Sequence, residues 1–338
     1  MSTETAPNKR IILGLMTLGP DTTHGARITS LDQFSQSLDI FQQKGYTELD
    51  TARLYDGGRQ ESFTRQARWK ERSLSIATKW YPIGPGTHKA EVLEAKLNES
   101  LRELGTDCLD IFYLHGPDRT TPYAETLEVL DTLHRQGKFK KLGLSNFSAF
   151  EVAEIATLAS ERRWVRPSVY QAVYNAITRG IEDELIPACR RYGIDIVIFN
   201  PLAGGFLSGK YKSTDVPAEG RFSNNHQLQG KMYRDRYFKS SIFQALQTLE
   251  PVAHQHGLSM VEVALRWCVH HSALKLLNGT DGVIVGFSSV DQLKGNLDDL
   301  DKGPLPGDVV EALDQAWHVV KADAAKFWHG DLVYAYDT

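Results

Sequence analysis

Four side chains that could together protonate an oxyanion stand at or just after short apolar runs of the sequence: Asp50, Tyr55, Lys79 and His115. A phenol has a pKa of about 10, and a lysine ammonium beside it stabilises the phenolate and lowers that pKa. A carboxylate would keep the lysine charged in a partly dry pocket, and a neutral histidine could hydrogen-bond a substrate carbonyl oxygen. This set suits protonation of the oxyanion that forms when hydride attacks a carbonyl. The hydride must come from a cofactor, because no side chain supplies one.

Each of these residues has an ordinary interpretation when it is taken alone. Asp50 and Tyr55 are common loop residues, Lys79 could be a solvated strand end, and His115 a core histidine. Their co-occurrence at the ends of several predicted strands is harder to explain in that way. The elements that would position them therefore decide between the two interpretations.

The periodicity of apolar residues predicts a repeated alternation of strands and helices. Strands are expected over residues 11–15, 46–50, 73–79, 108–115, 140–145, 168–171, 195–200 and 282–286. Helices are expected over residues 30–45, 59–70, 88–104, 122–136, 149–162, 181–192, 242–256, 259–271, 290–300 and 309–320. Units of roughly thirty residues are typical of βαβ crossovers. We therefore predict an α/β fold, a single (β/α)8 TIM barrel with a long loop over residues 201–240, after the seventh strand, and a C-terminal extension.

A doubly wound open sheet is the competing architecture. It is disfavoured because no GxGxxG motif follows any predicted strand and no linker divides the chain. We expect one domain over residues 1–338, with tails over residues 1–9 and about 325–338. In a barrel the carboxyl ends of all strands open on one face, where barrel active sites lie.

Composition excludes several classes of partner. Apolar residues make up 41% of the chain and charged residues 24%, and the net charge of −4 is spread over both signs, so neither nucleic acid nor a membrane surface is expected as a partner. Cys108, Cys189 and Cys268 are too few and too scattered for a disulfide framework, which favours a reduced, cytoplasmic protein. The apolar run at residues 11–18 is too short for a signal peptide or a membrane span.

Seven segments, in order along the chain, carry a resemblance to a known family: LDTARLYDGG, IATKW, IFYLHGPD, LGLSNFS, VYQAVYN, FNPLAGGFLSGKY and VGFSSVDQLKGN. Over residues 11–317 the chain resembles the aldo-keto reductase superfamily, and most closely its aflatoxin-aldehyde reductase branch. The resemblance implies NADPH-dependent reduction of an aldehyde or ketone to an alcohol. It also implies NADPH/NADP+ binding without a Rossmann fold, in agreement with the missing GxGxxG motif.

The resemblance assigns roles to individual residues. Tyr55 resembles the proton donor, Lys79 the residue that lowers its pKa, Asp50 the partner of the lysine, and His115 the residue that orients the substrate. Ser145, Asn146 and Gln171 resemble a clamp on the nicotinamide carboxamide, and Phe199 an aromatic ring that stacks on the nicotinamide. The loop along the pyrophosphate is implied to include Asn200, Pro201, Leu202, Ala203, Gly205, Leu207 and Lys210, and Arg221 resembles a further cofactor contact. The adenosine and 2′-phosphate end is implied to contact Gly286, Ser288, Gln292 and Asn296.

The substrate side is predicted to be aromatic. The expected wall of the barrel mouth consists of Met16, Trp80, Tyr81, Phe147, Phe206, Phe222 and Tyr233, although core packing could claim several of these residues. Tyr233 and Arg236 resemble substrate contacts of the branch. The branch usually ends in a short tail with a substrate-binding arginine, whereas residues 326–336 here contain none. This departure favours a bulky or aromatic carbonyl substrate, as in secondary metabolism or aldehyde detoxification.

Three features of the sequence have other possible interpretations. The segment GGFLSGK resembles a P-loop, but Tyr211 follows its lysine where a magnesium-binding Ser or Thr is required. The histidine pairs at residues 254/256 and 270/271 lack further ligands at metal-binding spacing, so no metal site is predicted. The chain also resembles the potassium-channel β subunits, which share the four residues, so an NADPH-binding regulatory subunit is the alternative function. The resemblance leaves a homodimer open, because dimers occur in the branch.

Overall fold

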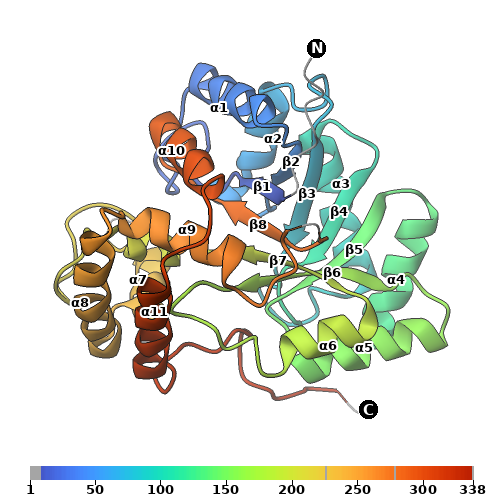
Figure 1. Ribbon diagram of the computed structural model, residues 1–338. Helices are drawn as coiled ribbons and strands as arrows, with labels where there is room; N and C mark the ends of the chain where they lie inside the picture. Colours follow the sequence, from blue (N-terminus) through green and yellow to red (C-terminus); the bar gives the residue numbers. More distant parts are fainter. Residues whose placement is uncertain (1–8, 225–226, 278, 337–338) are drawn as a thin grey trace. The chain divides into compact units, whose positions relative to one another are not determined.

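The computed structural model describes residues 9–224, 227–277 and 279–336. Its strands follow one another in chain order round a closed barrel, and neighbouring strands from β1 to β6 pair in parallel (Figure 1). The strands are β1 (Arg10–Gly14), β2 (Glu48–Asp50), β3 (Ser75–Trp80), β4 (Leu109–Leu114), β5 (Phe139–Ser145), β6 (Pro167–Val173), β7 (Asp195–Phe199) and β8 (Gly282–Val285). The predicted (β/α)8 barrel is confirmed.

Helices alternate with these strands, as the periodicity predicted. They are α1 (Leu31–Gln43), η1 (Tyr55–Gly58), α2 (Gln60–Gln66), α3 (Ala90–Leu104), α4 (Tyr123–Arg135), α5 (Ala149–Glu161), α6 (Leu185–Tyr192), η2 (Ala203–Ser208), α7 (Gln227–Tyr237), α8 (Ser240–Gln255), α9 (Met260–His270), α10 (Val290–Leu300) and α11 (Gly307–Val320). The elements η1 and η2 are short 3-10 helices. Of the described helices, none is long and apolar enough to cross a membrane.

The residues gather into two compact units, which we describe separately. We call the unit that contains Asp50, Tyr55, Lys79 and His115 the tetrad unit, and its described residues lie within 12–172, 183–197 and 327–336. The described residues of the other unit, the insertion unit, lie within 9–11, 173–182 and 198–326. The prediction of a single domain over the whole chain stays a prediction. All four residues of the predicted acid–base set lie in the tetrad unit.

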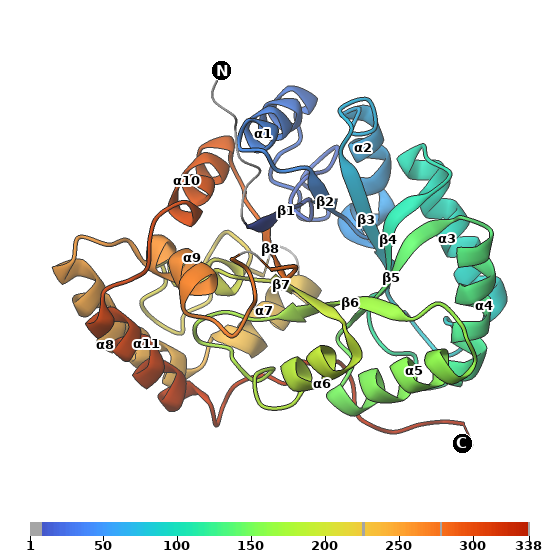
Figure 2. The same cartoon turned by 45° about the vertical axis from the view of Figure 1, so that its right-hand side comes forward.

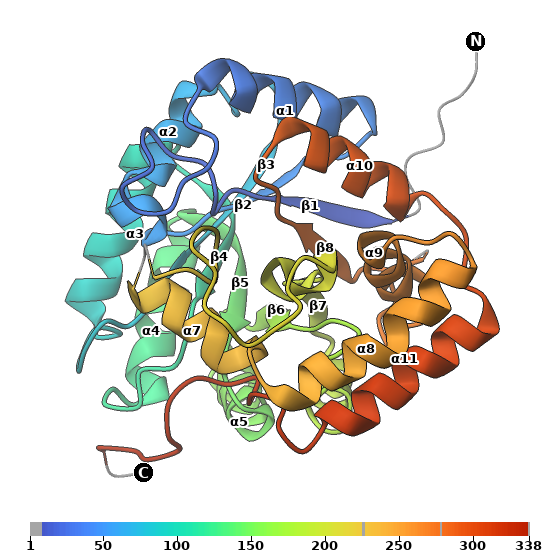
Figure 3. The same cartoon turned by 90° about the vertical axis from the view of Figure 1, so that its left-hand side faces the viewer.

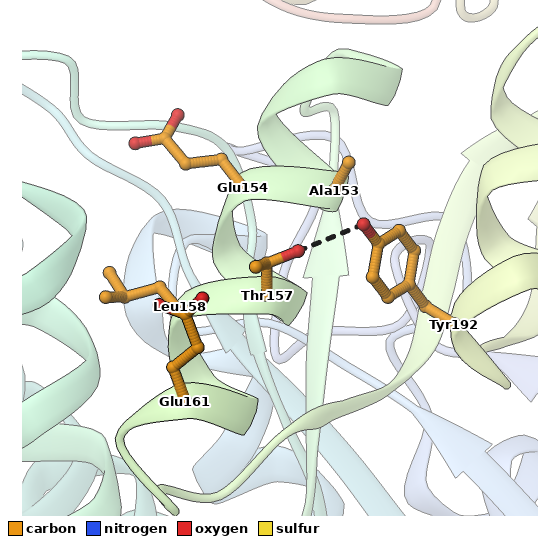
Figure 4. A pocket seen from close by; sticks show the side chains of 6 residues that line it. All are labelled: Ala153, Glu154, Thr157, Leu158, Glu161 and Tyr192. Atoms are coloured by element: carbon orange, nitrogen blue, oxygen red, sulfur yellow. Dashed lines mark hydrogen bonds between the residues drawn. The ribbon is translucent and has the colours of Figure 1, made fainter.

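In the tetrad unit, helices α3, α4 and α5 follow one another along the outer side of strands β3 to β5 (Figure 2). Most buried residues of the strands are aliphatic or aromatic, as expected for parallel strands covered by helices. Helix α5 begins with a capping box in which the Ser148 and Glu151 side chains bind each other's backbone amides. Thr157 of α5 and Tyr192 of α6 are joined through their hydroxyls at 3.0 Å, beside a shallow depression between the two helices (Figure 4).

In the insertion unit, α8 and α11 lie side by side (Figure 3). The loop predicted over residues 201–240 is partly helical, because η2 and α7 fall inside it. Aromatic rings fold this segment on itself: the Phe206 ring lies 5.0 Å from that of Phe243, and the Phe222 ring 4.9 Å from that of Phe238. Phe206 and Phe222, expected at the barrel mouth, are fully buried among these rings.

Several predicted boundaries are wrong. The helix predicted over residues 59–70 ends at Gln66, where tight turns follow and Arg68 and Ser73 adopt positive φ angles. The helix predicted from residue 181 begins at Leu185. Within the C-terminal extension predicted from about residue 325, Phe327 is buried. The predicted N-terminal tail lies almost wholly outside the described residues.

Candidate active site

Adjacent strands of the tetrad unit bring the predicted acid–base set together. Asp50 ends β2 and pairs in register with Ala77 of β3, while Lys79, two residues further along β3, pairs with Tyr113 of β4. His115 follows β4 directly, and its amide binds the carbonyl of Trp80 at 2.9 Å. Parallel pairing in this register explains why residues 65 positions apart in sequence meet at one edge of the sheet. We call Asp50, Tyr55, Lys79 and His115 the tetrad.

The predicted ion pair between Asp50 and Lys79 is present. Lys79 Nζ lies 2.5 Å from Asp50 Oδ1 and donates to the carbonyl of Thr51 at 2.6 Å. Lys79 has no exposed surface, and burial lowers its pKa while the charge and hydrogen bond of Asp50 raise it. Asp50 is fixed from its other side, because Gln171 Nε2 donates to Asp50 Oδ2 at 2.8 Å.

Tyr55 is the first residue of η1, a turn that leaves β2 with an irregular backbone. Its ring centroid lies 5.2 Å from Lys79 Nζ, and it meets the His115 ring edge-on with centroids 6.3 Å apart. The phenol is therefore beside the buried ammonium that the sequence predicted as its partner.

His115 is a neutral histidine at physiological pH. Burial lowers its pKa well below the usual value, and the charges of Lys79 and His329 act in the same direction. Its Nδ1 is buried and has no hydrogen-bond partner among the described residues. Because a neutral imidazole can donate from one nitrogen, His115 is suited to hydrogen-bond a carbonyl oxygen.

The predicted nicotinamide clamp follows β5 and lies on β6. Asn146 Nδ2 donates to the His115 carbonyl at 2.8 Å and to Ser145 Oγ at 3.1 Å, so this amide is tied to the tetrad. Asn146 Oδ1 is buried without a partner in the part of the chain described. An orphaned amide oxygen requires an N–H donor, and a carboxamide group supplies one. The residues present therefore fit a nicotinamide.

The insertion unit carries the residues predicted to contact the phosphates. Asn200, Ala203, Gly204 and Gly205 all have positive φ angles, and backbones of this kind turn their N–H groups into concave anion-binding nests. Space is open where a Cβ would stand on Gly205. Ala203 and Leu207 are buried and Lys210 is exposed. Pro201 and Leu202 lie within the nest along the chain, and Phe199 directly precedes it.

The start of α10 is the second predicted anion site of the insertion unit. Ser289 caps this helix, and the amide and the hydroxyl of Ser288 both donate to Gln292 Oε1, at 2.9 and 2.8 Å. Asn296 Nδ2 donates to the Gly286 carbonyl at 3.3 Å, which fixes the turn into the helix. Helix N-termini present free N–H groups and a positive dipole end, which suits a phosphate.

Arg221, the remaining predicted cofactor residue, is part of a small polar chain in the insertion unit. Its guanidinium lies over the Tyr233 ring, 5.0 Å from the centroid, and donates to the Tyr233 hydroxyl at 3.3 Å. That hydroxyl donates to Asn200 Oδ1 at 3.4 Å. Tyr233 and Arg236, predicted to contact substrate, both lie on α7. Tyr233 therefore contacts two predicted cofactor residues.

Two other predicted substrate residues lie in the tetrad unit. Trp80 follows Lys79 directly, and its indole N–H donates to the Thr87 carbonyl at 3.1 Å. Phe147 follows Asn146 and is fully buried against the Tyr123 ring, with centroids 6.0 Å apart. The roles of both residues toward substrate stay predictions.

The sequence did not predict the contacts of the C-terminal tail, residues 327–336. The amide of His329 binds the Asn146 carbonyl at 3.0 Å, and His329 Nδ1 lies 3.2 Å from the Tyr81 hydroxyl. The Tyr81 ring meets the His115 ring edge-on, with centroids 5.5 Å apart. Polar aromatic side chains thus continue from Tyr55 through His115 and Tyr81 to the tail. The aromatic residues of the segment FWHG could have indicated that the tail packs against the protein, but they did not indicate which residues it contacts.

A buried arginine anchors the tail. Arg119 binds Glu151 through two nitrogens, at 2.7 and 3.0 Å, and donates to the His329 carbonyl at 2.6 Å. The Tyr334 hydroxyl donates to the same Glu151 at 2.7 Å. Burial raises the pKa of Glu151, but the hydrogen bonds that its carboxylate accepts lower it by more. The net effect is a lowered pKa, so Glu151 is held in its charged form.

No cluster of His, Cys, Asp or Glu side chains suited to a metal ion occurs among the described residues. His256 instead lies 2.7 Å from Asp308, and His271 Nε2 accepts from the Leu305 amide at 2.9 Å.

Comparisons with known proteins agree with the barrel fold. The family model described as "Aldo/keto reductase family" matches residues 10–318, and the chain belongs to this family of oxidoreductases. An aldo-keto reductase of Pseudocercospora fijiensis is 45% identical over 297 residues, which are 86% of this chain and 99% of the relative. The human protein named aldo-keto reductase family 7 member A3 is 40% identical over 94% of this chain and 96% of its own length. Human aflatoxin B1 aldehyde reductase member 2 is 38% identical over 97% of this chain and 92% of its own length. The predicted likeness to the aflatoxin-aldehyde reductase branch is therefore confirmed.

Proposed function

We propose that this protein reduces an aldehyde or ketone to an alcohol with NADPH, and that Tyr55 is the general acid. The observation that carries the proposal is the buried Asp50–Lys79 ion pair beside the Tyr55 ring, with a neutral His115 ring edge-on to the Tyr55 ring. NADPH supplies the hydride when it is bound. All other steps belong to side chains of this chain.

Lys79 and Asp50 prepare the acid. A charged ammonium near the phenol stabilises the phenolate that remains after proton transfer, so it lowers the barrier to that transfer. The carboxylate of Asp50 opposes the loss of the lysine proton that burial would otherwise favour. The carbonyl oxygen would accept a hydrogen bond from His115 and then the proton of Tyr55 Oη.

The orphaned Asn146 Oδ1 supports NADPH as the cofactor, since it would accept from the carboxamide N–H group. Ser145 and Gln171 would complete this clamp. The nest at Asn200–Gly205 and the start of α10 would bind the phosphates. Cys108, Cys189 and Cys268 are thiols, which supports a reducing compartment, and we propose the cytoplasm.

We propose a bulky or aromatic carbonyl as the substrate. The Tyr81 ring contacts the His115 ring on one side and the His329 ring on the other. Aromatic walls of this kind favour flat, apolar compounds. Several relatives are named for reduction of aflatoxin B1 aldehyde, a role that fits the same class. An acidic aldehyde would meet no arginine in residues 326–336.

The proposal is tested by NADPH oxidation with a panel of aldehydes and Tyr55→Phe. We expect the wild type to reduce a neutral aromatic aldehyde with higher kcat/KM than succinic semialdehyde. Tyr55→Phe should lower kcat by about a hundredfold or more while NADPH still binds, because only the proton donor is removed. Tyr192→Phe, which loses a hydroxyl at the α5–α6 surface of the same unit, is the matched control and should keep full activity.

The proposed reaction would be refuted by a wild type that binds NADPH and turns over no carbonyl. Retained turnover in Tyr55→Phe would leave the reaction standing and would remove Tyr55 as its acid.

A further inference from the structure

The backbone that follows Tyr55 is unusual for L-amino acids. Asp56, Gly57 and Gly58 have φ angles of 50°, 62° and 89°, so three successive residues are left-handed. Glycine tolerates this region, but an aspartate there requires support from its surroundings. The turn also sets the direction in which the Tyr55 side chain leaves the backbone. Whatever stabilises the turn therefore positions the proposed proton donor.

The loop between β1 and α1 closes over Asp56 from one side. The Asp56 side chain has no exposed surface, and a Cβ added to Gly19 would lie 2.6 Å from Asp56 Cγ. A Cβ on Gly57 would lie 2.9 Å from the His24 ring. The turn thus fits against this loop with no room for added atoms.

Arg59 joins the turn to that loop. Its backbone N–H and its Nε both donate to the Asp56 carbonyl at 3.2 Å, and its Nη2 lies 3.0 Å from Asp56 Oδ2. The same guanidinium binds both carboxylate oxygens of Asp21, at 2.5 and 2.9 Å. A planar fork with several donors can hold two carboxylates at once, which a lysine cannot do in the same geometry.

A second arginine holds the far end of the turn. Arg53 is buried, donates to the Gly58 carbonyl and forms an ion pair with the buried Glu61. The turn is therefore held at Gly58 by the buried Arg53–Glu61 pair. At Asp56 it is held by Arg59, whose pair with Asp21 is partly exposed: the two side chains are 38% and 46% exposed. Arg59 is the more exposed of the two arginines, so it can be replaced without removing a side chain from the core.

We propose that Arg59, bridging Asp21 and Asp56, is a positioning residue that holds the left-handed turn and thereby keeps the Tyr55 phenol beside Lys79. The charged or titratable groups around the Asp56 carboxylate are Asp21, His24 and Arg59. Arg59 does not touch the reacting atoms. This inference rests on the proposed function, because it assigns to Arg59 a role in placing the proposed acid.

The test compares Arg59→Ala, Arg59→Lys and Arg72→Ala by steady-state reduction of a neutral aromatic aldehyde across the alkaline pH range. Arg72 forms a comparable pair with Asp39 of α1, also in the tetrad unit, at 2.5 Å and partly exposed. It is therefore a matched control for the loss of one surface arginine. Thermal unfolding and NADPH binding are measured for all variants.

We expect Arg59→Ala to lower kcat about tenfold or more, with NADPH affinity unchanged, because small misplacements of a catalytic group slow the chemical step. Reduction requires the protonated phenol, so its rate falls as pH rises through the pKa of Tyr55. If Tyr55 moves away from Lys79, that pKa rises and the alkaline limb of kcat moves to higher pH. A merely structural role for Arg59 would leave the position of the limb unchanged.

Arg59→Lys should recover part of kcat, and Arg72→Ala should resemble the wild type. The inference is overturned if Arg59→Ala matches Arg72→Ala in kcat and in the alkaline limb, or if kcat falls with no shift of the limb. Those results would leave the proposed function intact, whereas a wild type that reduces no carbonyl would overturn both.

Discussion

At the scale of single residues, the centre of the candidate site is a lysine that is buried together with its ion-pair partner, Asp50. Two charges in a dry environment are costly to separate, because removing one leaves the other without compensation. Burial lowers the pKa of Lys79 and Asp50 raises it, so Asp50 controls the charge on which the proposed activation of Tyr55 depends.

Asp50→Asn should therefore destabilise the protein by about 3 kcal/mol or more at pH 7, as for other buried pairs from which one partner is removed. With Asp50 gone, the pKa of Lys79 in the folded protein falls further below its unfolded value. A lysine with a depressed folded pKa destabilises the fold below its unfolded pKa, and this penalty shrinks as pH rises. Urea denaturation at pH 7 and pH 9 should show the gap from wild type narrowing.

The control for this prediction is Asp39→Asn, which breaks an exposed pair with Arg72. We expect a change of less than about 1 kcal/mol at either pH. An Asp50→Asn gap that is constant with pH would contradict the role of Lys79 ionisation.

The pairing of Asp50 with Lys79 could be predicted from sequence, because both end neighbouring strands of a repeating β-α pattern. The contact between Tyr81 and His329 could not, since it joins residues 248 positions apart through an irregular tail that has no periodicity. The ion pair between Arg59 and Asp21 could not be predicted from the sequence for the same reason. Side chains in irregular segments meet according to loop geometry, which apolar patterning does not specify.

At the scale of elements, strand β5 makes room for a ring beside the buried lysine. The Tyr113 ring of β4 lies 5.9 Å from Lys79 Nζ, and a Cβ on Gly143 would stand 2.1 Å from Tyr113 Cδ1. Gly143 is directly opposite Tyr113 in the register, at a point where the pairing of β5 with β6 also shifts. A glycine within a strand often marks such a close approach.

Gly143→Ala should destabilise the protein by about 1–3 kcal/mol, because the added methyl group must displace a fully buried ring. The matched control is Gly295→Ala in α10, where a Cβ would meet no atom within 4 Å. That change should stabilise by up to about 1 kcal/mol, since alanine favours a helix. Midpoints of urea unfolding measure both, and equal midpoints for the two variants would contradict the steric argument.

The order and type of the elements in the barrel could be predicted because each strand is a short apolar run and each helix has one apolar face. The helix over residues 227–237 was missed because its sequence, QLQGKMYRDRY, has little amphipathic pattern. The glycines at 57 and 58 in the sequence indicate a turn after Tyr55 but do not specify its conformation. Its left-handed Asp56 depends on the loop that covers it, which lies 30 or more positions away in sequence.

At the scale of the whole molecule, a buried histidine makes stability depend on pH. His88 has no exposed surface, and neither ring nitrogen has a hydrogen-bond partner among the described residues. Burial lowers the pKa of His88 to about 4, whereas the nearby Asp118 opposes this change. An unfolded histidine has a pKa of about 6.5, so between these values the unfolded chain binds the extra proton.

Stability should therefore be complete above pH about 6.5 and fall as the pH is lowered towards 4, with a share from His88 on the order of 2 kcal/mol between pH 7 and pH 5. His88→Phe, which keeps a ring but cannot be protonated, should remove that share, while His115 contributes in the same direction and remains. His254→Asn, at an exposed position, is the control. Urea midpoints at the two pH values measure the effect, and an unchanged slope in His88→Phe would assign it elsewhere.

The docking of the C-terminal tail has a consequence for how such a protein could diversify. Residues 327–336 reach His115 through Tyr81 and are held by Arg119 and Glu151, whereas the turn of Tyr55 is held by Arg53 and Arg59. The two sets of anchors share no residue. Changes in the tail could therefore alter which molecules are accepted while the proton-donating machinery is inherited unaltered. Gly57 and Gly58, by contrast, border His24 and Arg53 so closely that this turn should tolerate almost no variation.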